Sequence, residues 1–452
     1  MNIFEDLKIK EEKLHTKYKL IRDNLKLTGE QEVLRDWVKG FEDRDNKIVK
    51  EFQTTFHSTF WEFYLFAIFK ELNFKIDFSR NRPDFIIESP SKLYIEAVVS
   101  NIKQDGKQET ERSLDDIISM LEPPFLQRNF YNELDESIVR HSNAILSKSK
   151  KYLNEYSALD YIDNTVPYII ALSGYDQINY GNQYIYPMMA LLYGAYYDME
   201  NDTYARKKSI LKPNSQVDIP IGIFNDSKME HISAIIFSAT ITLGKLTSLS
   251  LSQNKSLLKT NFVIAIKHDT DKPHWQPHVI DENNPEELAD GLFVFHNPFA
   301  KNKLDTSVFR NKGIMQIKAD DKGHIFENNR LPLFSRLNYF LRHNFIINSL
   351  AFEAFNKFNA KDHYRISFYE ILEIDLDVEP KEMTILDIGN DLLGYNLPCI
   401  VDLEEKDISL IHELNLKDED SIVAIIYAKL DNFGNTTQWF LHSILQKMHN
   451  KT

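Results

Sequence analysis

The stretch between Phe56 and Leu72 constrains the fold of this chain more than any other segment. Aromatic and aliphatic side chains fill most of its positions, and their spacing predicts a helix. A helix that is apolar around its whole circumference must be buried on nearly all sides. We therefore expect a core helix with one carboxylate, Glu62, at a position where an apolar side chain would be usual.

The segments after this helix predict an α/β domain. Strand patterns bounded by turn residues occupy residues 74–78, 85–88 and 93–99, and buried strands are expected at 167–172, 234–237 and 291–295. Further helices are expected over about 136–156 and over 186–196. The domain therefore begins with a helix, a three-stranded meander, a second helix and a strand.

The two ends of the chain differ from this domain. Residues 1–50 are highly charged, with apolar residues near helical spacing, and predict a helical N-terminal segment. After residue 331 the pattern predicts a helix to about residue 358, then strands at 366–378, 397–401 and 422–427. We therefore divide the chain into the N-terminal segment, a domain over 51–330, and a C-terminal mixed α/β unit over 331–452.

Length and composition fit a folded protein of two or three domains. The chain has 452 residues, of which 43% are hydrophobic and 27% are charged. No stretch has the length and apolarity of a membrane span, and no signal-peptide pattern occurs, so we expect a cytoplasmic protein without a membrane partner. The single cysteine, Cys399, excludes an intramolecular disulfide and a Cys-rich zinc site. Any metal must be bound mainly by oxygen or histidine.

The charge of the chain argues against general affinity for nucleic acid. The net charge is -14, whereas phosphate binding needs Lys and Arg at the contact surface. Three segments are nevertheless basic, at residues 140–151, 206–212 and 301–312. Each is either a solvated face or a local contact for phosphate.

Glu62 and Asp84 each have a structural and a functional interpretation. Glu62 is the fourth residue of Thr59-Phe60-Trp61-Glu62, which fits a capping box with Thr59 as the N-cap. In the alternative, Glu62 lies inside the buried helix and needs a partner or a ligand. Asp84 follows Pro83 at the start of a strand, where an Asp is common in turns.

Glu96 has the stronger claim to a functional role. It lies in Leu93 to Val99, which otherwise reads as a strand buried on both faces. A lone carboxylate there is either a paired core charge or a metal ligand, because unpaired burial is so unfavourable. A tight hairpin over residues 89–91 can bring Asp84 and Glu96 side by side. Hard divalent cations such as Mg²⁺ prefer such oxygen ligands.

Together these residues resemble a known nuclease pattern. Glu62 in a helix, then Pro83-Asp84, then Glu96-Ala97-Val98 is similar to the E, PD and (D/E)XK pattern of the PD-(D/E)XK, or restriction-endonuclease-like, superfamily. The resemblance covers residues 56 to about 172 in the same order of elements. It implies a mixed sheet flanked by helices and a metal-dependent endonuclease that hydrolyses phosphodiester bonds, with DNA as the expected substrate, in a setting such as bacterial defence.

One position departs from this pattern. The lysine of the E-x-K pattern should lie on the same strand face as Glu96, but Val98 occupies its place. Some members of the superfamily supply the lysine from the following helix. Here that helix offers Arg140, Lys148, Lys150 and Lys151. Lys148 is the favoured candidate, because it lies on the apolar stripe with Ile145 and Tyr152 that should face the sheet. The alternative is a lysine whose stem lies along the surface with its charge in water.

The resemblance implies a role for each site residue. Asp84, Glu96 and the carbonyl oxygen of Ala97 would hold Mg²⁺, or Mn²⁺ in its place, and Glu62 would bind directly or through water. Lys148 would help to position the attacking water. If no lysine reaches the metal, the chain is instead a catalytically inactive nuclease-like scaffold that binds a partner or ligand. An oligomer or a protein partner is compatible with either reading.

Two other polar patterns are weaker. His296-Asn297-Pro298 is most simply a turn after a strand. Acidic residues that alternate with apolar ones between Glu373 and Glu379 are typical of a half-exposed strand.

Overall fold

The computed structural model describes residues 1–101, 111, 113, 116, 127–176, 184–201, 203–256, 261–268, 275–320, 323–327, 330–340, 353, 356, 362–389 and 398–448. The chain forms two compact units. The first consists of Met1–Met120, Pro124–Leu257 and Ile280–Arg336, and the second of Leu121–Pro123, Leu258–Val279 and Leu337–Thr452. Within the described residues, no helix has both the length and the apolar character needed to cross a bilayer.

The N-terminal part of the first unit is helical, as its sequence predicts. It contains the short 3-10 helices η1 (Glu11–Lys13) and η2 (Leu25–Leu27) and the α-helices α1 (Thr16–Asp23), α2 (Thr28–Trp37), α3 (Ile48–Thr54) and α4 (His57–Glu71). α4 is the predicted core helix. Buried residues of these helices, such as Val33, Phe52 and Phe63, share one apolar cluster with strand residues such as Ile95 and Ile169. Residues 1–50 therefore pack into the same core as the sheet.

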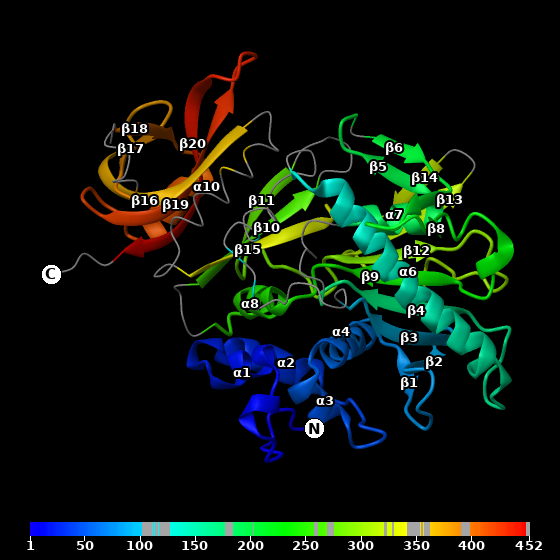
Figure 1. The fold of residues 1–452 in the computed structure, drawn as a ribbon. Coiled ribbons are helices and arrows are strands. Elements are labelled where there is room, and N and C mark those ends of the chain that lie inside the picture. Colours follow the sequence, from blue (N-terminus) through cyan, green and yellow to red (C-terminus); the bar gives the residue numbers. More distant parts are fainter. Residues whose placement is uncertain are drawn as a thin grey trace. The chain divides into compact units, whose positions relative to one another are not determined.

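An eight-stranded mixed sheet forms the centre of the first unit (Figure 1), in the order β1-β2-β3-β4-β9-β12-β13-β14. Its strands are β1 (Lys75–Asp77), β2 (Phe85–Ser89), β3 (Leu93–Val99), β4 (Tyr168–Ser173), β9 (Ala234–Ser238), β12 (Leu292–His296), β13 (Ile314–Asp320) and β14 (Gly323–Glu327). The first three form an antiparallel meander. β3, β4 and β9 are parallel to one another, and β12 runs antiparallel to β9. The predicted α/β class is confirmed.

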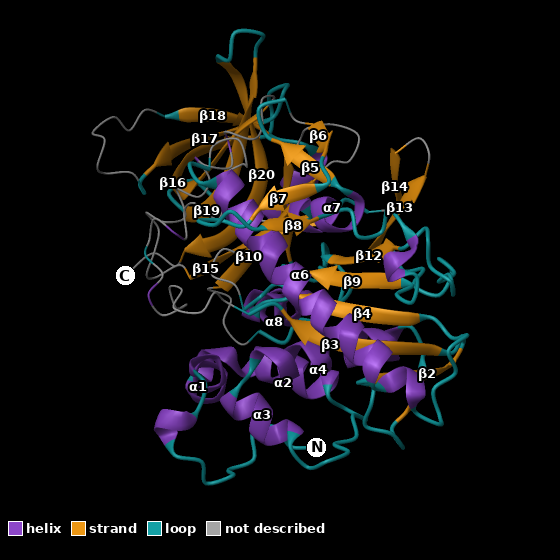
Figure 2. Ribbon diagram, turned by 45° about the vertical axis from the view of Figure 1, so that its right-hand side comes forward, coloured by secondary structure: helices purple, strands orange, loops and turns teal. Residues whose placement is uncertain are grey.

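Helices cover both faces of this sheet. Side chains of β3 at Leu93, Ile95 and Ala97 join the apolar cluster that contains α4. The alternate residue Glu96 therefore points to the other face, where the long helix α6 (Phe130–Asn154) crosses the strands (Figure 2). The remaining elements of this unit are α7 (Tyr186–Tyr193), α8 (Leu243–Ser252), η5 (Tyr156–Ala158), η6 (Ser227–Met229) and two hairpins, β5 (Ala195–Asp198) with β6 (Thr203–Arg206) and β7 (Ser209–Leu211) with β8 (Asp218–Pro220).

The later part of the chain is richer in strands than its sequence predicts. β10 (Asn261–His268), β11 (Trp275–Ile280) and β15 (Leu333–Phe340) form a three-stranded sheet. The predicted helix from residue 331 is wrong at β15, which is a strand paired with β10 in this sheet. Of residues 341–358, only Glu353 and Asn356 are described.

A closed five-stranded barrel occupies residues 362–448. Its strands are β16 (Asp362–Asp375), β17 (Glu382–Asp387), β18 (Cys399–Asp402), β19 (Ser421–Leu430) and β20 (Thr436–Met448), in the order β16-β17-β18-β20-β19. The helix α10 (Glu405–Glu413) lies between β18 and β19 in the chain. β18 and β20 pair in parallel, which closes the barrel around an apolar core that includes Ile371, Met383 and Ile426. The strands predicted around residues 366–378, 397–401 and 422–427 are confirmed.

Candidate functional site

The pairing of β2 with β3 brings Asp84 beside Glu96. Phe85 pairs with Ile95, so Asp84 lies at the point where β2 begins and Glu96 is its neighbour on β3. Oδ2 of Asp84 accepts a hydrogen bond of 2.7 Å from the backbone N–H of Ala97. Asp84 immediately precedes β2, which begins at Phe85. Its carboxylate thus accepts from the N–H of Ala97 at a position where β2 itself provides no acceptor. The hairpin spacing in the sequence predicts this neighbourhood.

Glu96 is buried against α6 and receives three hydrogen bonds on one oxygen. Its side chain is 1% exposed. Oε1 accepts from Nζ of Lys148 at 2.7 Å, from Nζ of Lys151 at 3.3 Å and from the hydroxyl of Tyr156 at 3.2 Å. Oε2 is also buried but has no hydrogen-bond partner among the described residues. Such an atom is costly unless something else satisfies it.

The helical periodicity of α6 explains how its lysines reach Glu96. Ile145, Lys148 and Tyr152 lie on one stripe of the helix, and Ile145 and Tyr152 are buried. The side chain of Lys148 is 21% exposed and that of Lys151 is 35% exposed, so neither extends fully into water. The prediction that Lys148 faces the sheet is confirmed. The structural alternative for Glu96, a paired core charge, accounts for Oε1 but not for Oε2.

Glu62 approaches from the opposite face of the sheet and is not part of a capping box. α4 begins at His57, its N-cap is Phe56, and no side chain caps it. Thr59 is fully buried, and its hydroxyl has no hydrogen-bond partner among the described residues. The capping-box interpretation is therefore wrong, because Thr59 lies inside the helix and Glu62 lies one turn further along.

The charges of Glu62, Asp84, Glu96 and Lys148 act on one another. Burial, followed by the negative charge of Asp84, raises the pKa of Glu62 well above its usual range. Burial and then Glu96 raise the pKa of Asp84 to about 6, although Lys148 and the Ala97 N–H oppose this. Burial alone would lower the pKa of Lys148, but Glu96, Asp84 and Glu62 outweigh it and raise that pKa. Perturbed, interacting groups of this kind cluster at functional sites.

The three carboxylates do not by themselves form a metal-binding set. Among the described residues, no group of three or more His, Cys, Asp or Glu side chains could hold a metal ion. Two carboxylates remain suitable, because Glu96 Oε2 has no donor and only Oδ2 of Asp84 is engaged, by Ala97. Oxygen donors of this type are those that a hard divalent cation prefers.

Lys151 and Tyr156 also contact Glu96. The sequence offers Lys151 as one of four basic residues that could supply the missing lysine, but Lys148 was favoured, and Tyr156 was not identified. Tyr156 lies in η5, just beyond the end of α6, and its ring is buried. The available signal was the spacing from Lys148: Lys151 follows it by three residues and Tyr156 by eight, which are close to one and two helical turns.

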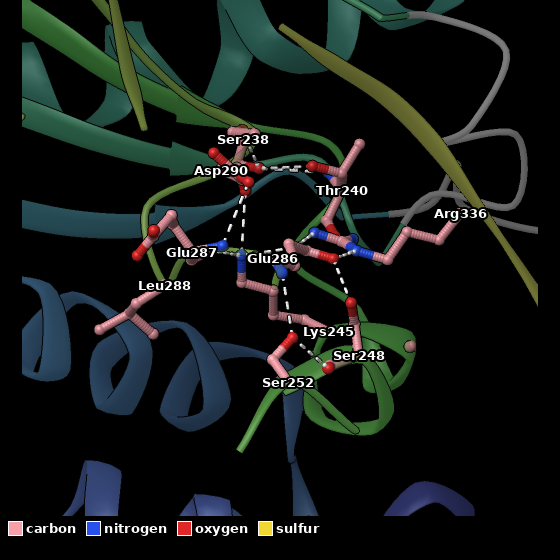
Figure 3. Close-up of polar contacts among 12 residues, drawn as sticks. Ser238, Thr240, Lys245, Ser248, Ser252, Glu286, Glu287, Leu288, Asp290 and Arg336 are labelled. Carbon is pink, nitrogen blue, oxygen red and sulfur yellow. Dashed lines mark hydrogen bonds and ion pairs between the residues drawn. The ribbon is translucent and has the colours of Figure 1, made fainter. Parts of the chain in front are cut away.

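A second polar cluster in the first unit is fully buried and internally satisfied (Figure 3). Lys245 of α8 pairs with Glu286 at 2.5 Å and also donates to the carbonyls of Glu287 at 2.6 Å and Asp290 at 3.1 Å. Arg336 grips both oxygens of the same carboxylate, with Nε at 2.6 Å from Oε2. Neither Lys245 nor Glu286 is exposed, so this cluster is a structural tie rather than a binding site.

The other polar candidates have structural partners. Nε2 of His296 lies 2.9 Å from Oε1 of Gln316. The side chain of Asn297 donates to the carbonyls of Met229 at 2.9 Å and Ile232 at 2.8 Å, as a turn residue would.

The basic segments outside α6 are partly neutralised or tethered. Arg206 donates to the carbonyl of Tyr193 at 2.9 Å, and Lys312 pairs with Glu287. Lys207 lies over the ring of Tyr196, with Nζ 3.3 Å from the ring centroid.

Comparison of this chain with protein-family models, with curated proteins and with solved structures found no match in any of the three.

Proposed function

We propose that this chain is a metal-dependent nuclease that hydrolyses phosphodiester bonds in DNA. The observation that carries the proposal is the buried Glu96, which has one oxygen held by lysine and the other without a donor, beside Asp84. A buried carboxylate oxygen without a donor is costly, and binding a hard cation would remove that cost. The order α4, β1, β2, β3, α6, β4 supports a restriction-endonuclease-like core.

The residues of the site would share the work of hydrolysis. Asp84, Glu96 and the carbonyl oxygen of Ala97 would hold Mg²⁺ or Mn²⁺, which supplies charge stabilisation and a more acidic water when bound. Lys148 would orient the attacking water, because its ammonium already lies 2.7 Å from Glu96 and keeps its proton. Glu62 would accept a hydrogen bond from water at the Asp84 side of the site.

Lys148 offers a physical answer to the missing lysine at Val98. Glu96 faces α6, so a cation from α6 reaches the same space that the third position of an E-x-K strand would reach. The lysine would thus come from α6 and not from the strand, and its charge lies beside Glu96 in either case.

The acidic chain favours a second candidate, a nuclease-like scaffold without activity. Its net charge is -14, and Lys148 and Lys151 already neutralise Glu96. In that case the ion pairs would serve only to stabilise the core, and added metal would change nothing.

Cleavage by the full chain separates the two candidates. Supercoiled plasmid, single-stranded DNA and single-stranded RNA are incubated with Mg²⁺, with Mn²⁺ or with EDTA. We expect metal-dependent nicking that falls at least about 100-fold in Glu96→Gln and in Asp84→Asn, since both lose a charged ligand. Cutting of RNA alone would keep the reaction class and correct the substrate.

The control is Glu88→Gln on the neighbouring strand. Glu88 is exposed, and within the described part of the chain its ion pair is with Lys75, so its loss should leave the rate unchanged. Circular dichroism of every variant shows whether the fold persists. Absence of nicking by the wild-type chain with either metal, or equal nicking by Glu96→Gln, would exclude the nuclease and leave the scaffold.

A further inference from the structure

Three donors converge on a single oxygen of Glu96, and they are chemically unequal. Lys148 and Lys151 carry positive charge, whereas Tyr156 is neutral. Burial, and then the charge of Glu96, raise the pKa of Tyr156, so its hydroxyl keeps its proton and must donate. All three contacts are made to Oε1, whereas Oε2 is buried and has no hydrogen-bond partner among the described residues.

The three side chains also differ in rigidity. Tyr156 is 1% exposed and turns about two side-chain bonds only. Lys151 is 35% exposed and has a flexible four-carbon stem, with Nζ 5.0 Å from the centroid of the Tyr156 ring. The tyrosine is therefore the fixed donor, and the lysine is able to move away.

A divalent cation at Oε2 would affect these contacts in opposite ways. It repels the ammonium groups of Lys148 and Lys151, because like charges at such short range disfavour each other. It does not repel a neutral hydroxyl, and it polarises the carboxylate that the hydroxyl binds. The hydrogen bond from Tyr156 is thus the contact that persists when the site is filled.

We propose that Tyr156 is a positioning residue, which holds Glu96 by Oε1 so that Oε2 faces the cation, while Lys151 competes with that cation. This inference rests on the proposed function, because it concerns the metal site of the same reaction. It assigns opposite effects to two neighbours: Tyr156 strengthens metal binding and Lys151 weakens it.

The test measures Mn²⁺ binding to the full chain directly, by electron paramagnetic resonance or calorimetry, alongside cleavage. In Tyr156→Phe we expect the dissociation constant for Mn²⁺ to rise about tenfold, the size of one hydrogen bond to a charged group. The cleavage rate should recover largely at saturating Mn²⁺. In Lys151→Met we expect Mn²⁺ to bind more tightly than in the wild type.

The matched control is Tyr152→Phe. Tyr152 lies one turn earlier, and its hydroxyl donates to Oδ1 of Asn164 at 3.1 Å rather than to Glu96. It should match the wild type in Mn²⁺ binding. Melting temperatures of the two phenylalanine variants should agree within a few degrees, so that a loss of metal affinity in Tyr156→Phe is not a loss of fold.

The outcomes separate this inference from the nuclease proposal. Mn²⁺ binding that weakens only in Tyr156→Phe, without any cleavage by the wild type, would keep the positioning role and reject the nuclease. Equal binding by the wild type and Tyr156→Phe would overturn the positioning role of Tyr156, and binding in Lys151→Met that is no tighter than in the wild type would overturn the competition by Lys151. A wild-type chain that binds no Mn²⁺ overturns both.

Discussion

A buried oxygen without a hydrogen-bond partner has a different meaning at two positions of this chain. Glu96 and Thr59 both have a buried oxygen without a hydrogen-bond partner in the described part of the chain. The orphan oxygen of Glu96 belongs to a carboxyl group on the strand next to Asp84, and in the proposed site a cation would satisfy it. The hydroxyl of Thr59 is neutral and lies inside α4, where nothing in the proposed chemistry uses it.

We expect Thr59→Val to leave stability unchanged or to raise it by about 1 kcal/mol, because an unpaired buried hydroxyl is replaced by a methyl group of the same shape. If Thr59 were a capping residue, the same change would instead lower the free energy of unfolding by about 1 kcal/mol. Urea denaturation measures the difference. Thr55→Val is the control, since Thr55 donates to the carbonyl of Glu51 at 2.9 Å and should not gain stability.

Site residues could be predicted from the sequence where burial made their charge unusual. Glu96 stood in an apolar strand, and Lys148 stood on an apolar helix stripe, so both were identified. Tyr156 could not be found in this way, because a tyrosine among apolar residues is ordinary and only its hydroxyl contact with Glu96 marks it. The capping-box interpretation of Thr59 and Glu62 failed although the capping pattern is complete in the sequence, because Phe56 takes the N-cap position instead.

At the scale of elements, close packing of two helices depends on one glycine. A Cβ atom on Gly29 of α2 would lie 2.1 Å from Oγ of Ser250 in α8 and 2.7 Å from the carbonyl oxygen of Lys255. The second contact is with backbone, which cannot rotate away. The absence of a side chain therefore sets how near α2 and α8 come.

We expect Gly29→Ala to destabilise the first unit by about 1–3 kcal/mol, as overpacking does. Helix propensity alone predicts the reverse, a gain of about 1 kcal/mol, so the sign of the change decides between the two effects. Chemical denaturation provides the measurement. Glu32→Ala, at an exposed position of the same helix, should shift stability by no more than about 0.5 kcal/mol. Equal behaviour of the two variants would contradict the close contact.

Elements were predictable where local pattern and tertiary context agreed. β3 was placed at residues 93–99 because an apolar run ends at turn residues on its N-terminal side. β15 was misread as part of a helix, since the sequence around Leu333 to Phe340 is compatible with both periods and its partner β10 lies far away in the chain. Long-range pairing, not local preference, determined its state.

At the scale of the whole molecule, the buried cluster around Glu286 joins distant segments. Lys245 is 41 residues before Glu286, and Arg336 is 50 residues after it. No local pattern reports such a tie, and the only hint was a lysine in the otherwise apolar and small-residue helix α8. Burial would raise the pKa of Glu286, but Arg336 and Lys245 outweigh it and lower that pKa to about 2.

We expect Glu286→Gln to lose about 3–5 kcal/mol at neutral pH, because two buried cations then lack their counter-charge. The ordinary pKa of Glu is near 4.5, so the stabilisation by the ionised carboxylate is fully present above that pH and is lost as the pH falls towards 2. The difference in free energy of unfolding between the wild type and Glu286→Gln should therefore become smaller as the pH falls. Urea denaturation at pH 7 and at about pH 3 tests this.

The control for this prediction is Glu327→Gln, which removes an exposed pair with Lys318. That change should cost less than about 1 kcal/mol at either pH. A gap between wild type and Glu286→Gln that stays constant with pH would show that the charge of Glu286 does not contribute.

The position of Arg336 in the chain has a consequence for biosynthesis. The ribosome releases the chain from its N-terminus at about 5–20 residues per second, so Lys245 and Glu286 emerge seconds before Arg336. Until then, Glu286 has its lysine and serine partners but not the guanidinium that grips both oxygens. The proposed catalytic residues are all translated before residue 157. They therefore exist in the nascent polypeptide well before Arg336 can pair with Glu286 and complete the buried cluster of the first unit.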